Sequence, residues 1–284
     1  MRTRCSLLIP AVALVAALTA CGADGPSAKS YRAEADGFCS AGNIAISSAA
    51  EPTNASQVAT SAGAAVTTID AQVAMLRAKK APGGDDQAQI DGIVAAIAEV
   101  SAPTKALQDA AANGDDAGMA KAGVEMQSRA DAAATAAQAY GLAQCGAALK
   151  PAVAHLYEGT KSVVKGSFVT RSEALCLDAG NRTDAVSPPG KTLASTSRYL
   201  DAMLAISVKL AGDMKAIPVP PGDEAAVSEL VAAMDALNAK GQEVSQAAKS
   251  NNPNLVLALV DEVEVATTAL NAKLDAYGLE TCAG

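Results

Sequence analysis

The sequence predicts an all-α protein built from two tandem four-helix up-down bundles, each closed by one disulfide. Three observations support this prediction. Half of the 284 residues are apolar but only 2% are aromatic, so the apolar content is mostly Ala, Val and Leu, and alanine favours helices over strands. The apolar residues recur at helical spacing. Four of the cysteines form two pairs with the same separation.

Residues 1–20 have the features of an export signal. A short basic segment precedes an apolar stretch, Leu7–Leu18, which is too short to span a membrane. The following motif, Leu18-Thr19-Ala20-Cys21, resembles the lipobox of bacterial lipoproteins, in which the cysteine thiol receives a diacylglyceryl group before cleavage. The resemblance implies that Cys21 is the lipidated first residue of the mature protein. An ordinary signal peptide followed by a chance cysteine is the alternative.

Residues 21–30 are small and polar, as expected of a flexible tether. The lipid on Cys21 would hold the protein at the extracytoplasmic face of the cell membrane, because two acyl chains anchor firmly. That compartment permits disulfides. The formal net charge of −8 repels phosphate backbones, so we expect no nucleic-acid partner.

A tandem duplication is indicated by the remaining cysteines. The members of each pair, Cys39 with Cys145 and Cys176 with Cys282, are 106 positions apart, and Tyr-Gly-Leu begins five residues before the second cysteine of each pair. We therefore divide the chain into repeat 1 (31–150), a linker (151–167) and repeat 2 (168–284).

Four cysteines allow three pairings. Only Cys39–Cys145 with Cys176–Cys282 preserves the duplication and joins ends that an up-down bundle brings together. Closing loops of this length contributes about 4–5 kcal/mol by restricting the unfolded chain, on a model-dependent estimate.

Each repeat is expected to contain four helices. In repeat 1 they cover about 33–50, 54–80, 85–112 and 115–141, and in repeat 2 about 168–184, 188–216, 223–250 and 253–279. Ser187 before Pro188 and Asn252 before Pro253 are typical N-caps followed by proline. Gly141 and Gly278 are expected to end the fourth helices in the left-handed conformation.

The pattern argues against catalysis and against a bound metal. His155, in the linker, is the only histidine, whereas di-iron bundles and structural zinc sites need several ligands. Disulfide-bonded cysteines cannot act as nucleophiles, and no phosphate-binding or dinucleotide motif is present. Acidic pairs such as Asp115-Asp116 and Asp223-Glu224 suit helix N-termini better than calcium loops. We expect no enzyme, cofactor, catalytic residue or metal site.

The Ala-rich repeats ending in Tyr-Gly-Leu-x-x-Cys resemble helical lipoproteins of actinobacteria, a family of uncharacterised function. The resemblance implies an envelope protein and no particular activity. We expect a non-catalytic binding or interaction module for an unknown protein or small molecule. The alternative is an envelope enzyme or metal-binding protein whose site the sequence hides.

The junction between the repeats is the expected place for such binding. Small core side chains let helices pack closely, so we expect no pocket inside either repeat. Larger residues gather near the junction instead, and Leu156, Tyr157 and Phe168 are candidates for ligand contact or inter-repeat contact. Pro103 and Gly241 weaken the third helices, which either opens a groove or adapts a long helix to its neighbours.

Overall fold

The structure, a computed structural model, describes residues 26–146 and 148–283. In this part of the chain it is all-helical, without a strand. Residues 1–20 and Cys21 lie outside the described residues, as do the next four residues of the expected tether. The rest of that tether overlaps the first helix, because the Ser27 side chain accepts a hydrogen bond from the Ser30 amide and caps a helix that begins at Ala28.

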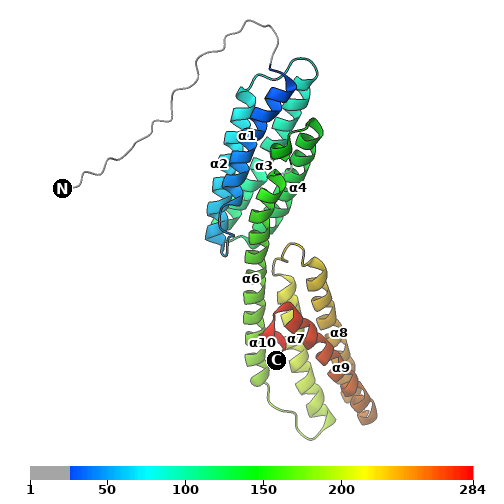
Figure 1. The fold of residues 1–284 in the computed structure, drawn as a ribbon. Coiled ribbons are helices and arrows are strands. Elements are labelled where there is room, and N and C mark those ends of the chain that lie inside the picture. The colour runs from blue at the N-terminus through cyan, green and yellow to red at the C-terminus, as the bar shows by residue number, and fades with distance from the viewer. Residues whose placement is uncertain (1–25, 147, 284) are drawn as a thin grey trace, which may run out of the picture.

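Ten helices, two of them very short, make up the described residues (Figure 1). In chain order they are α1 (Ala28–Ser47), α2 (Ala55–Ala78), α3 (Asp86–Ala112), α4 (Asp116–Tyr140), α5 (Ala143–Gly146), α6 (Leu149–Asp184), α7 (Leu193–Lys215), α8 (Glu224–Lys249), α9 (Pro253–Tyr277) and α10 (Glu280–Ala283). None of them is long and apolar enough to cross a membrane.

The segment 151–167, expected as a linker, is instead part of the 36-residue helix α6. Its buried residues recur at helical spacing and join the first core; they are Leu149, Ala152, Val153, Leu156 and Val164. Pro151 lies in the first turn, where proline is tolerated. In Figure 1 α6 therefore leaves the first group of helices and continues as the first helix of the second group.

The start of α7 also differs from the expectation. The helix begins at Leu193 rather than near Pro188, because Thr192 and Ser195 form a reciprocal capping box. Ser187 caps no helix. The stretch from Pro188 to Gly190 is non-helical, since consecutive prolines and a glycine cannot continue a helical ladder.

The same local contacts occur in both repeats, at positions whose numbers differ by 137. Disulfides join Cys39 to Cys145 and Cys176 to Cys282. Edge-to-face aromatic pairs also recur, with Tyr31 on Tyr140 at 6.5 Å between ring centroids and Phe168 on Tyr277 at 5.7 Å.

An acidic residue three positions before the first cysteine fixes the short helix that carries the second. The Asp36 carboxylate accepts hydrogen bonds from the backbone amides of Ala143, Gln144 and Cys145 at 2.8–3.3 Å. In repeat 2 the Glu173 carboxylate accepts from the Thr281 amide at 2.8 and 3.0 Å. Each disulfide is thus supported by a charge-assisted cap.

The Tyr-Gly-Leu motifs form Schellman turns, as the sequence predicts. Gly141 and Gly278 adopt φ angles of 87° and 91°, a region that glycine enters without steric cost. The following leucine amides donate to carbonyls five residues back, and both leucines are buried. The chain then reverses and brings each second cysteine back to the helices.

The two groups of helices have different cores. One continuous apolar cluster extends through α1–α4 and the first half of α6. The second group, made of the rest of α6 with α7, α8 and α9, contains two smaller separate clusters. One is built around Phe168, Met214 and Leu274, and the other around Val244 and Leu259.

Candidate functional site

The candidate site is an apolar groove between the two smaller clusters of the second group. In that group α7 packs on α6 and α8, and α8 packs on α9, whereas α6 and α9 lie apart except at the end of α9, where Tyr277 contacts Phe168. The short helix α10 bridges α6 and α9 at one end only. The space left beside α10 has a volume of about 450 Å³, within the usual range for ligand pockets.

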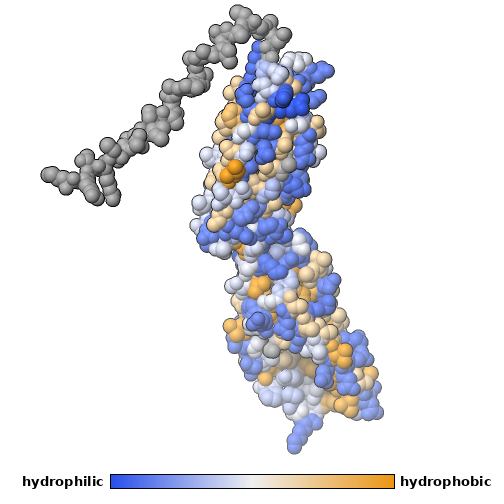
Figure 2. All heavy atoms as spheres, viewed as in Figure 1, coloured by the Kyte–Doolittle hydropathy of each residue, from blue (hydrophilic) through white to orange (hydrophobic). Residues whose placement is uncertain are grey.

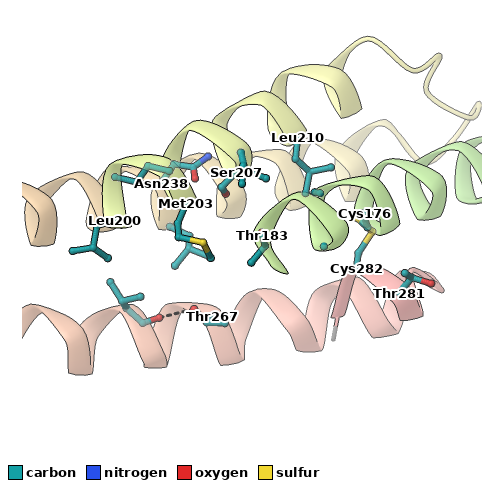
Figure 3. A pocket seen from close by; sticks show the side chains of 17 residues that line it. Cys176, Thr183, Leu200, Met203, Ser207, Leu210, Asn238, Thr267, Thr281 and Cys282 are labelled. Carbon is teal, nitrogen blue, oxygen red and sulfur yellow. Dashed lines mark hydrogen bonds between the residues drawn. A yellow bond between two sulfur atoms is a disulfide. The ribbon is translucent and has the colours of Figure 1, made fainter. Parts of the chain in front are cut away.

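Five helices supply the lining of the groove (Figure 3). Cys176, Ala179, Gly180 and Thr183 come from α6, while α7 contributes Leu200, Met203, Leu204 and Leu210 among others. Val263 and Thr267 come from α9, and the Cys176–Cys282 disulfide closes one end. A smaller cavity of about 80 Å³ continues inward from this end toward Met214 and Leu274.

Few polar groups face the groove. The Thr267 hydroxyl donates to the Val263 carbonyl of its own helix at 2.8 Å, so it is already satisfied. Asn238 is buried on α8 and lines the groove, and its amide has no hydrogen-bond partner among the described residues. The groove therefore suits a mainly apolar ligand that offers polar contacts to Asn238 and to the hydroxyls of Thr183 and Ser207, which also line it.

The expectation that neither repeat contains a pocket is wrong, because repeat 2 contains this groove and repeat 1 has an open hollow of about 480 Å³ between α2 and α3. Repeat 1 has alanines at many core positions of α4, including Ala130, Ala133 and Ala137, which let helices approach closely. In repeat 2 the groove is lined by larger side chains, such as Leu200, Met203 and Leu204, which hold the helices apart. An added Cβ on Gly241 would lie 2.6 Å from the Leu204 side chain, so α7 and α8 approach each other closely at this glycine.

Gly241 and Pro103 differ in their surroundings. Both α3 and α8 continue through these positions. Gly241 lines the groove, whereas Pro103 is buried inside α3. The groove is therefore a property of repeat 2.

In repeat 1 the equivalent space is filled by the first half of α6. This segment packs against α1, α2 and α4, and it separates α1 from α4. Counting from the first cysteine of each repeat, Gly180 stands where Asn43 stands. Asn43 donates to the Gln144 carbonyl at 2.7 Å, so a side chain bridges repeat 1 at a point where repeat 2 has none.

The three junction candidates do not come together in one site. Leu156 is buried in the first core and Phe168 in the second. Tyr157 is half-buried against the first core, with the Lys161 ammonium 5.5 Å from its ring centroid. None of the three lines the groove.

Polar contacts hold α6 to both repeats around the junction. The Asp116 carboxylate of α4 accepts from the Ser167 hydroxyl at 2.6 Å and pairs with Arg171 at 2.8 Å. On the other side, Asp223 pairs with Lys165 at 3.1 Å and accepts from the Tyr277 hydroxyl at 2.8 Å. Burial and this hydrogen bond raise the pKa of Tyr277 well above its usual value, so the phenol stays a donor.

Acidic and imidazole groups elsewhere do not assemble a metal site. Among the described residues no group of three or more His, Cys, Asp or Glu side chains is arranged to hold a metal ion. The Asp115 side chain accepts from the Gly118 amide and caps α4. His155 Nε2 donates to the Ala49 carbonyl at 2.8 Å and ties α6 to the loop after α1.

Beside the groove, the first half of α9 carries exposed apolar side chains. Leu257 is 68% exposed and Val260 is 45% exposed. Figure 2 shows hydrophobic residues gathered over this end of the second group of helices. The signal available in the sequence was the all-round apolar character of Leu255–Val260, which exceeds what one buried face of a helix needs.

The chain matches no known family model, and no curated protein or solved structure is detectably similar to it, so the groove has to be interpreted from its own geometry.

Proposed function

We propose that this chain is a lipid-anchored lipoprotein of the cell envelope that binds a partner without catalysis, and that the groove of repeat 2 is its binding site. The observation that carries this proposal is an open apolar space of about 450 Å³ in a small helical group. We also infer that the chain is organised as two four-helix up-down bundles that share α6.

Three features support a binding role. The groove combines an apolar lining with a few polar groups, among them the buried amide of Asn238, which suits recognition of a mainly apolar surface. Exposed Leu257 and Val260 extend the apolar surface beyond the groove, and such patches mark interaction sites. The cysteines lining it are joined in a disulfide and supply no thiolate for chemistry.

Filling the groove tests the site. Gly180 lies on α6 facing the groove, and an added Cβ there meets nothing within 4 Å. We expect Gly180→Leu to fold normally, since leucine has the higher helix propensity by about 0.8 kcal/mol, and to weaken binding of the apolar dye Nile red at least about tenfold, roughly 1.4 kcal/mol. Fluorescence titration of the mature protein measures this.

Gly166→Leu is the matched control. Gly166 is exposed on the same helix, has equally open surroundings and does not line the groove. It should bind the dye as the parent does. Equal dye binding by the parent and Gly180→Leu would contradict the proposed site.

The anchoring part of the proposal has its own test at Cys21. Cys21→Ala should remove the thiol that accepts the diacylglyceryl group and leave the precursor uncleaved. Mass spectrometry of the membrane fraction should then find the acylated N-terminus only in the parent. Membrane-bound parent with an unmodified Cys21 would show that no lipid anchor exists.

A further inference from the structure

The groove of repeat 2 has the position that a helix occupies in repeat 1. In repeat 1 the first half of α6 packs on both α1 and α4. His155 contacts Ala49, just past the end of α1, and Tyr157 lies against Gly123 in the first half of α4. In repeat 2 the groove lies between the last turns of α6 and the middle of α9. Both repeats therefore build the same slot, and no described segment fills the second one.

The exposed face of α9 corresponds to the face of α4 that contacts α6. An added Cβ on Gly123 of α4 would lie 3.2 Å from the Tyr157 ring, and Ala120 is packed against the same core. Counted 137 residues on, these positions are Val260 and Leu257. Their exposure is thus explained by the missing neighbour.

We propose that the slot in repeat 2 receives one amphipathic helix of a partner protein, in the way that repeat 1 receives its own α6. This proposal rests on the proposed function and names its ligand. The buried segment of α6 in repeat 1 runs from Leu149 to Val164, so the partner helix needs about four turns. Its apolar face follows the i, i+3, i+4, i+7 spacing of helices that bind in grooves.

The slot specifies two features of that helix. Val260 stands where repeat 1 has Gly123, against which Tyr157 packs. Because valine is larger than glycine, the partner helix carries a small residue at the position equivalent to Tyr157. Glu264 is exposed and has no cationic partner among the described residues. A lysine or arginine of the partner helix placed beside Glu264 suits this carboxylate.

Extending the chain after Cys282 tests this proposal directly. In the mature protein, Ala283 and Gly284 are replaced by the sequence of residues 146–166 with Tyr157→Ala, which reproduces the path that follows Cys145. We expect the extension to raise the Tm of repeat 2 by about 5 °C and to reduce Nile red binding at least about tenfold, because a tethered helix has a high effective concentration.

A control extension of the same length replaces the residues equivalent to Val153, Leu156 and Val164 by serine. It should change neither the Tm nor dye binding. If both extensions behave alike while Gly180→Leu still blocks the dye, the slot binds a small apolar molecule and the helix proposal is wrong. If Gly180→Leu has no effect on the dye, the proposed function itself fails.

The identity of the helix donor is tested by the parent protein. A second copy of this chain as donor would give concentration-dependent dimers in sedimentation analysis, and the extension would abolish them. That result would overturn the proposal of a separate partner protein. A monomeric parent that is stabilised by the extension supports it.

Discussion

Replacing both Cys176 and Cys282 by serine is expected to unfold repeat 2 at physiological temperature while repeat 1 stays folded. The disulfide closes a loop of 106 residues, which contributes about 4–5 kcal/mol by restricting the unfolded chain. That is a large share of the roughly 5–15 kcal/mol that stabilises a typical domain. Repeat 2 has little other stabilising free energy, because the groove divides its core into two small clusters.

Thermal unfolding followed by circular dichroism, combined with limited proteolysis, measures this effect. The variant should lack the part of the helical circular-dichroism signal that belongs to repeat 2. The protease should cut it first within α7–α9. The control is Cys39→Ser with Cys145→Ser, which removes a loop of the same length. Repeat 1 should survive that loss, because its single core includes the first half of α6. Equal melting temperatures of the repeats that have lost their disulfides would contradict this expected difference in stability.

Phe168→Ala is expected to destabilise repeat 2 by about 3–5 kcal/mol, the usual cost of removing a buried aromatic ring. The ring is 1% exposed and packs edge-to-face on Tyr277 at 5.7 Å. Tyr277 in turn donates to Asp223 at the start of α8. Loss of the ring therefore loosens three helices of repeat 2 at once, and urea unfolding measures the free-energy change.

Tyr157→Ala is the comparison for this prediction. Tyr157 is half-buried on the same helix and packs against the first core, so its loss should cost less and should act on repeat 1. The two unfolding transitions, assigned by proteolysis, distinguish the effects. If Phe168→Ala leaves the transition of repeat 2 unchanged and lets the repeats separate, then Phe168 is an inter-repeat contact.

Much of the fold is predictable from the sequence, because helix propensity and turn conformation depend mainly on residues that are close together in the chain. The all-helical class follows from alanine content, and the left-handed turns follow from Gly141 and Gly278. The equal cysteine spacing indicates the pairs that the structure joins. The start of α7 differs from the prediction because the capping box of Thr192 and Ser195 begins the helix at Leu193, and Pro188 does not begin it.

The site was missed for a different reason. The equal cysteine spacing and the shared motifs imply equivalent repeats, whereas the groove arises from their differences, such as Gly180 in place of Asn43. The continuity of α6 was also missed, because its buried residues, including Val153 and Leu156, belong to the core of the preceding repeat. Only the tertiary structure shows that the core of repeat 1 includes the first half of α6, a helix that continues into repeat 2.

The continuous helix α6 determines how far the groove can reach. At 1.5 Å of rise per residue, Gly180 lies about 45 Å along the axis from Leu149. The start of α1 lies at the end of the molecule away from the second group of helices (Figure 1). A molecule seated in the groove is therefore held at a fixed distance from the start of α1, at the far end of the second group of helices. A flexible linker between the two groups would instead let that distance vary.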